Sequence, residues 1–212
     1  MFGNLLQQMY NIADTWVVGR YLGSDALAAV GSSYTLMTFL TSIIIGLCMG
    51  SGAAISMQYG SGDSKKMRQS VFISFCLIAG ISIALNIIVY IGMDFILWAL
   101  QIPNEIQAMM RDYLEIIFLG ITATFLYNYF ANLLRAIGNS VLPLVFLAVS
   151  AVLNVVLDLV CVLLFNWGVK GAAIATVFSE FISAIGIAIY TFKRFKQLIP
   201  CLLYTSPSPR DA

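Results

Sequence analysis

The sequence contains no histidine and little charge. Its 212 residues include 11 Lys and Arg and 10 Asp and Glu, so 10% of the chain is charged, against about 25% in an ordinary soluble domain. The missing histidine excludes His-based triads, His metal sites and His proton relays. The formal net charge of +1 and the lack of a basic cluster argue against a nucleic-acid partner.

The sequence also lacks cysteines at the short paired spacings of metal or disulfide motifs. The four cysteines are Cys48, Cys76, Cys161 and Cys201. The first three fall in apolar stretches, where we interpret them as small hydrophobic residues. No basic segment precedes the first apolar stretch, so the beginning of the chain does not resemble a cleavable signal peptide.

Apolar residues dominate what is present. They make up 60% of the chain, and the mean hydropathy is +0.92. A soluble core of this size could not hide so much apolar surface, so the sequence predicts an all-α membrane protein. A membrane-spanning helix needs about 20 apolar residues, and six stretches meet this requirement: 1–22, 28–59, 69–100, 105–137, 141–165 and 171–192. We expect the first to be the later part of a truncated helix.

Basic residues predict the orientation of these helices. Most of them fall at one end of the predicted bundle: Lys65, Lys66, Arg68, Arg135, Lys193, Arg194 and Lys196. Cytoplasmic loops of membrane proteins carry an excess of Lys and Arg. We therefore expect this end to be cytoplasmic, in a plasma or inner membrane, with the N-terminus on the same side.

The last residues, CLLYTSPSPRDA, do not continue this pattern. They contain a Pro/Ser segment, Ser206 to Pro209, after a basic stop. We interpret residues 1–200 as one six-helix transmembrane lobe, with its first helix truncated. We interpret residues 201–212 as a non-native or disordered tail.

Two carboxylates lie inside the predicted spans. They are Asp14, in NIADTWVVG, and Asp158, in LNVVLD. A charged side chain at mid-bilayer costs roughly 2.5–3.5 kcal/mol on insertion scales, so each needs a reason. Asp14 lies four residues after Tyr10, and Asp158 lies four after Asn154. Each pair therefore shares one helix face.

A fifth polar residue, Thr176, lies in GAAIATVFS, where small side chains allow close approach of a neighbouring helix. The predicted cation or proton site consists of Tyr10, Asp14, Asn154, Asp158 and Thr176. These residues offer hard oxygen ligands, which suit a small cation or a proton rather than a soft metal. For Na⁺, the expected ligands are Asp14, Asp158 and Asn154. The alternative for each residue alone is a polar group satisfied within the bundle.

Four motifs in this sequence resemble the multidrug and toxic compound extrusion (MATE) transporters. ADTWVVGRYLGSDALAAVG is similar to their first loop, and QYGSGDSKK to the turn after their second helix. LRAIGNSVLP resembles their loop between helices four and five, and LNVVLD followed by GAAIAT resembles helices five and six. The resemblance covers about residues 5–195, and the motifs follow the family's order.

The resemblance implies one six-helix lobe of a twelve-helix antiporter that exports organic, often cationic, compounds in exchange for Na⁺ or H⁺. It implies that the five predicted site residues form a cation site in the N-terminal lobe. No enzymatic activity and no cofactor are expected. The expected partners are small organic substrates, the lipid bilayer and a missing C-terminal lobe, with no nucleic acid.

Two positions depart from the family pattern. Asn139 stands where an aspartate is common, and Glu180 stands where a glutamine is common. Glu180 is one turn past Thr176, so it either faces the same cavity or lies near the cytoplasmic end. If a second lobe completes the cavity, polar residues of the second span should be exposed in this chain alone. These residues are Ser33, Thr35, Thr38, Thr41 and Ser42.

Three other functions are open at this point. A lipid-linked-oligosaccharide flippase of the same superfamily commonly lines its cavity with arginines, whereas no arginine is mid-helix here. Gly60 to Asp63 reads GSGD, which matches the signature of GxGD intramembrane aspartyl proteases. However, Lys65 and Lys66 follow closely and indicate a surface turn, so the position of Asp63 distinguishes this alternative. A purely structural membrane protein would not place acids in several spans.

Overall fold

The computed structural model describes residue 12 and residues 14–195, and the described elements are helices. Residues 14–21 are helical and precede α2 (Ser24–Gly60). The others are α3 (Ser64–Ile91), α4 (Met93–Ala99), α5 (Asn104–Ala136), α6 (Val141–Leu159), the π-helix η1 (Val160–Leu164) and α7 (Gly168–Arg194).

Five helical segments in the described part of the chain are long and apolar enough to cross a membrane. They are Ser24–Gly60, Ser64–Ile91, Asn104–Ala136, Val141–Leu164 and Gly168–Arg194. The predicted all-α membrane fold is therefore confirmed. Most of the first predicted span, 1–22, lies outside the described residues, as do residues 201–212 of the predicted tail. At 37 residues, α2 is about 55 Å long and exceeds the roughly 30 Å hydrocarbon core of a bilayer.

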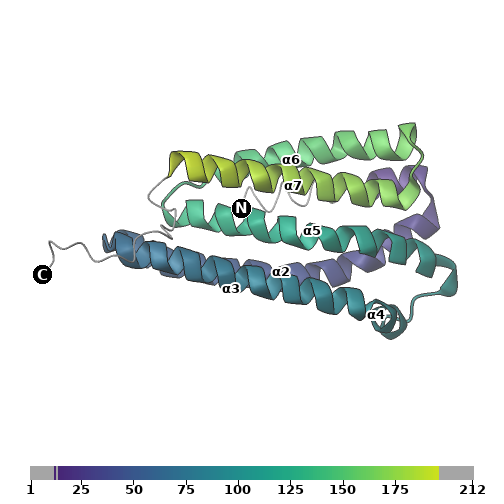
Figure 1. The fold of residues 1–212 in the computed structure, drawn as a ribbon. Helices are drawn as coiled ribbons and strands as arrows, with labels where there is room; N and C mark the ends of the chain where they lie inside the picture. Colours follow the sequence, from purple (N-terminus) through teal and green to yellow (C-terminus); the bar gives the residue numbers. More distant parts are fainter. Residues whose placement is uncertain (1–11, 13, 196–212) are drawn as a thin grey trace, which may run out of the picture.

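Helix α5 forms the centre of the bundle. It lies between α2 and α3 on one side and α6 and α7 on the other (Figure 1). In its most apolar 18-residue stretch, 56% of the residues are buried, against 17% in the corresponding stretch of α3. The connections are short, so consecutive long helices run antiparallel. The α2–α3 turn and the α5–α6 loop lie at one end, and α4 and the α6–α7 loop lie at the other.

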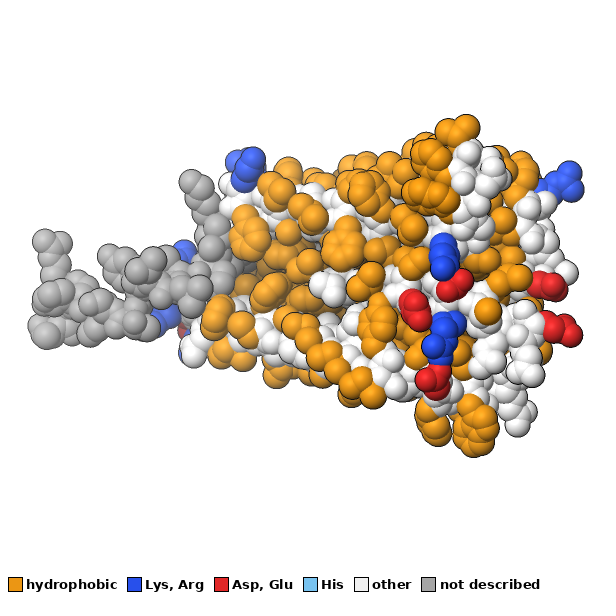
Figure 2. Space-filling model, turned by 45° about the vertical axis from the view of Figure 1, so that its right-hand side comes forward, with side chains coloured by type: hydrophobic (Ala, Val, Ile, Leu, Met, Phe, Trp, Pro, Cys, Tyr) orange, Lys and Arg blue, Asp and Glu red, His pale blue; other side chains and the backbone are white. Residues whose placement is uncertain are grey.

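Charge is distributed as a membrane protein requires. Figure 2 shows a mostly apolar middle, with charged side chains gathered toward the end that carries α4. There Arg111 forms an ion pair with Asp94, and Lys170 lies 3.2 Å from Asp112. Lys65, Arg135 and Arg194 belong to the opposite end (Figure 1). The apolar middle can therefore face lipid while both ends face water.

One predicted span is wrong in its extent. The sequence predicts a single helix over 69–100, but α3 ends at Ile91 and α4 follows Gly92 as a separate short helix. A Cβ at Gly92 would lie 3.0 Å from the carbonyl oxygen of Ile88, so only a residue without a side chain fits here easily. Trp98 of α4 is 73% exposed at this end, as expected of an interfacial aromatic residue.

Aromatic packing joins α3 to α5. The ring of Phe75 on α3 lies 5.4 Å from that of Phe125 and 5.2 Å from that of Tyr129, centroid to centroid. The Tyr129 hydroxyl donates to the Val71 carbonyl at 2.6 Å, so a polar group in this apolar cluster is satisfied. This cluster stabilises the half of the bundle away from η1.

Gly171 sets the approach of α7 to η1. A Cβ at this position would lie 3.1 Å from the Cys161 carbonyl oxygen and 3.1 Å from the Trp167 Cβ. We expect Gly171→Ala to lower the free energy of unfolding by about 1–3 kcal/mol, because backbone must move to admit the methyl group. Thermal unfolding of the detergent-solubilised protein measures this change. Gly46→Ala is the matched control, because a Cβ there meets nothing within 4 Å. Equal loss in both variants would contradict the packing argument.

Candidate ion site

The structure brings four of the five predicted site residues into the interior. Asp14 comes from the helical residues 14–21, and Asn154 and Asp158 lie one turn apart on α6. Thr176 lies on α7. All four are buried, with Asn154 and Asp158 fully so. The fifth, Tyr10, lies outside the described residues.

The carboxyl groups of Asp14 and Asp158 lie close enough to interact electrostatically. Asp14 Oδ1 and both Asp158 carboxylate oxygens are buried without a donor from the described residues. Two ionised carboxylates buried side by side repel each other and have no proton to share. The arrangement therefore requires a positive charge: a proton on one carboxyl group or a cation bound between the two.

Thr176 orients the Asn154 side chain. The Asn154 Nδ2 group donates to Thr176 Oγ1 at 3.2 Å. This contact leaves the amide oxygen of Asn154, which is also buried, without a donor from the described part of the chain. An unpartnered amide oxygen one turn from Asp158 is a suitable ligand for a hard cation.

The acids of the site are too few to form a metal cluster by themselves. Among the residues that the structure describes, no group of three or more His, Cys, Asp or Glu side chains is placed to hold a metal ion. A sodium ion would therefore depend on Asn154 as the third protein ligand, beside Asp14 and Asp158. A proton would need only the two carboxylates.

Sequence reasoning missed Tyr113. This side chain is buried on α5, within electrostatic reach of Asp14, Asp158 and Glu180. It lies seven residues before Gly120, and therefore on the same helical face. The sequence offers little sign of this position, because a single tyrosine in an apolar helix usually indicates a packing residue.

The π-helix η1 begins two residues after Asp158. The Phe165 N–H donates to the Val160 carbonyl at 3.1 Å, across five residues rather than four. Single π-turns within α-helices are frequent at functional sites. The VCVLL segment contains no proline or glycine, so the sequence offers no signal for this feature.

Asp63 lies outside the membrane-spanning helices, at the end of the bundle opposite η1 (Figure 1). It caps α3: its Oδ1 accepts from the Lys66 backbone N–H at 3.0 Å, and its Oδ2 lies 3.2 Å from Lys66 Nζ. The Lys66 backbone hydrogen bond lowers the pKa of Asp63 below its ordinary value. A half-exposed helix cap outside the membrane spans is not an intramembrane catalytic aspartate, so the protease alternative is rejected.

The predicted polar face of α2 is partly wrong. Thr35, Thr38 and Ser42 are exposed and Thr41 is half-buried, but Ser33 is fully buried. The Ser33 hydroxyl donates to the Ala29 carbonyl at 2.7 Å, which satisfies it inside the bundle. Thr38 and Ser42 donate likewise to carbonyls of their own helix, which leaves them free to face lipid or another protein surface.

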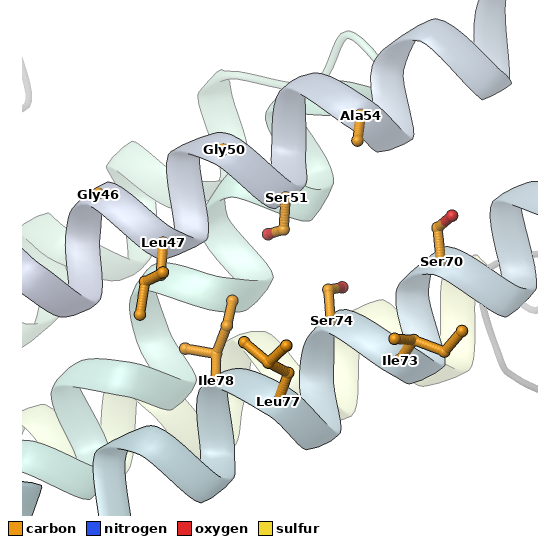
Figure 3. A pocket seen from close by; sticks show the side chains of 10 residues that line it. All are labelled: Gly46, Leu47, Gly50, Ser51, Ala54, Ser70, Ile73, Ser74, Leu77 and Ile78. Atoms are coloured by element: carbon orange, nitrogen blue, oxygen red, sulfur yellow. The ribbon is translucent and has the colours of Figure 1, made fainter.

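A groove of about 440 Å³ lies between α2 and α3, away from the acids. Figure 3 shows Gly46 and Gly50 on α2 and Ser70 and Ser74 on α3 among the residues that line it. Its lining contains no charged side chain. The groove therefore has no means of holding a cation by charge.

Comparisons with known proteins identify the family of this chain. The MatE family model matches residues 1–160. The chain belongs to the MatE family. It is 33% identical over 200 residues to the probable multidrug resistance protein YpnP of Bacillus subtilis, covering 94% of this chain and 44% of YpnP. It is 30% identical over 201 residues to the multidrug export protein MepA of Staphylococcus aureus, covering 91% of this chain and 43% of MepA.

Solved structures of MATE transporters share the fold of this chain. A MATE crystal structure in the bent conformation superposes with a TM-score of 0.90 at 26% identity, covering 99% of this chain and 47% of the other. The chain thus spans about half the length of the relatives it matches. MatE proteins are transporters, which supports the prediction that this multi-pass membrane chain is not an enzyme.

Proposed function

We propose that this chain is the N-terminal lobe of a two-lobed antiporter that exports organic compounds across the plasma or inner membrane in exchange for Na⁺ or H⁺. The closeness of Asp14 and Asp158 carries the proposal, because their buried oxygens lack donors among the described residues and need a positive charge. The twofold length of the relatives supports the second lobe. The excess of basic residues at the α2–α3 end supports a cytoplasmic location for that end and for the N-terminus.

Coupling requires that the ion favour one conformation over the other. Uptake of a cation from outside holds Asp14 and Asp158 together and favours release of substrate from the lobe. Loss of the cation to the cytoplasm leaves two carboxylates that repel each other, so the acid-bearing helices separate and substrate can bind again. Thr176 links this change to α7 through Asn154. Alternating access of the cavity to the two sides completes the cycle.

The flippase alternative is less well supported by charge. Such carriers need basic residues to hold an anionic lipid-linked substrate. The described Lys and Arg residues lie near helix ends, whereas Asp14, Asp158 and Glu180 lie within the bundle. An acidic interior favours positive ligands instead.

Transport measured under separate sodium and pH gradients tests the proposed function. The complete transporter is reconstituted into liposomes carrying either a sodium gradient or a pH gradient, and ethidium movement is followed by fluorescence. We expect one gradient to drive transport and its collapse by the matching ionophore to stop it. Liposomes without protein provide the control. Ethidium movement that neither gradient accelerates would overturn the antiport proposal.

A further inference from the structure

The groove between α2 and α3 has a lining that suits hydrocarbon. Its larger side chains are all aliphatic: Leu47, Ile73, Leu77 and Ile78. Two of its serines already have partners within the protein, since the Ser51 hydroxyl donates to the Cys48 carbonyl at 2.9 Å and the Ser74 hydroxyl lies 2.9 Å from that of Tyr129. These hydroxyls have little capacity left for a polar ligand, so the lining favours an apolar one.

Glycines give the groove its room. A Cβ at Gly46 or at Gly50 would meet nothing within 4 Å, and both glycines belong to the lining. The volume of about 440 Å³ falls in the range of ligand pockets, roughly 300–1,000 Å³. Figure 3 shows the two helices with Ser51, Ser70 and Ser74 between them. Since α3 is the least buried of the five long helices in the described part of the chain, this side of the bundle is available to lipid.

The groove lies at the depth of the acyl chains of one leaflet. Ser70 follows the first residue of α3, Ser64, by six residues, which is about 9 Å along the helix axis. The headgroup region takes up about 5–8 Å on each side of a bilayer, so Ser70 lies just beneath it. From there the lining continues to Ile78, about 12 Å deeper.

Basic residues lie where the headgroup of such a lipid would be. Lys66 precedes Ser70 by four residues and therefore shares its helix face. The Lys66 side chain is 74% exposed, and its pair with Asp63 is a surface pair, of a kind that contributes about 0–1 kcal/mol. The Lys66 ammonium can therefore bind a second anion. With Lys65 and Arg68 nearby, this turn carries three basic residues and one acid, so its net charge is positive.

We propose that the α2–α3 groove binds one acyl chain of an anionic phospholipid, whose phosphate group lies beside Lys66. The aliphatic lining holds the chain, and the positive charge of the adjoining turn selects a negatively charged headgroup. Basic pockets between transmembrane helices bind anionic headgroups in the same way. The lipid site lies away from Asp14 and Asp158, and it does not depend on the proposed export function.

Two lipids with the same chains and different headgroup charge test the headgroup contact. Dioleoyl phosphatidylglycerol, which is anionic, and dioleoyl phosphatidylcholine, which is neutral overall, are titrated onto the purified complete transporter, and bound lipid is counted by native mass spectrometry. We expect Lys66→Gln to weaken phosphatidylglycerol binding about fivefold, equivalent to about 1 kcal/mol, and to change phosphatidylcholine binding less than twofold. Lys170→Gln is the matched control, because Lys170 also pairs with an aspartate but lies at the opposite end of the bundle.

A side chain placed in the groove tests the acyl-chain contact. Gly50→Leu should weaken binding of both lipids about tenfold, because the added side chain occupies the space of the chain that they share. Gly31→Leu is the control on the same helix, since a Cβ there also meets nothing within 4 Å but Gly31 does not line the groove. Ala54→Leu provides the same comparison if the Gly50 variant does not elute as a single species.

Each outcome decides one part of the proposal. Equal effects of Lys66→Gln and Lys170→Gln on phosphatidylglycerol would overturn the role of Lys66. Undiminished binding of both lipids to the groove variants would show that lipid binds elsewhere on the surface, and would overturn the groove as the site. Absence of bound lipid from the unaltered transporter would also overturn it, as expected if the additional half of the longer protein covers the groove. Gradient-driven ethidium transport decides the export function separately from all three.

Discussion

Asp158→Asn should reduce gradient-driven export by the complete transporter to the level of liposomes without protein, and Asp14→Asn should do the same. Each change removes one of two neighbouring buried carboxylates, so the proposed coupling ion would lose a ligand. Membrane insertion should survive, because replacing a buried acid by an amide removes a burial cost rather than adding one. Export of ethidium by reconstituted protein and the yield of membrane-inserted protein measure the two effects separately.

Asp63→Asn is the matched control for these variants. Asp63 is a half-exposed helix cap at the other end of the bundle, so its loss should leave export largely intact. Its pKa is lowered in the folded protein, so the stability it contributes is present above its unfolded pKa and is lost as pH falls through its folded pKa. Comparable loss of export at all three positions would argue for a structural role of the acids instead of an ion site.

The sequence is sufficient to predict the helices and the acids they bring together. Long apolar runs in lipid can only be helices, because every backbone polar group must be satisfied internally. The four-residue spacing of Asn154 and Asp158 fixes their shared face without any knowledge of the fold. Predicting that they lie near Asp14 required the resemblance to the family, since no local sequence pattern relates α6 to residues 14–21.

Three features required the folded structure. The break at Gly92 is marked in the sequence only by this glycine and Asp94, within an otherwise apolar stretch, and Met93 and Leu97 of α4 are buried beyond it. Ser33 looks like an exposed polar residue, but a hydroxyl that bonds to its own helix is as easily buried as alanine. Glu180 has two possible surroundings in the sequence, and only the packing of α5 against α7 places Thr124 beside it.

The isolated lobe should fail to transport. Its acids lie inside the described bundle, but Thr35, Thr38 and Ser42 of α2 are exposed along one helix. The hydroxyls of Thr38 and Ser42 donate to carbonyls of their own helix. This face is therefore tolerated in lipid, but lipid offers its polar groups no further hydrogen bonds. The relatives are about twice as long, and in the proposed transporter the additional half would cover such a face and form the other wall of the cavity.

Expression of residues 1–200 in an efflux-deficient bacterial strain tests directly whether the isolated lobe exports a drug. We expect cells carrying the lobe to be as sensitive to ethidium as cells carrying an empty vector, because one wall cannot close a cavity to either side. The complete transporter serves as the positive control, and immunodetection in the membrane fraction shows that the lobe is present. Alternating access requires two bodies that move against each other, and a second copy of this lobe could supply the second body. Resistance conferred by residues 1–200 alone would therefore contradict the half-transporter proposal and indicate a homodimer that pairs the exposed faces of α2.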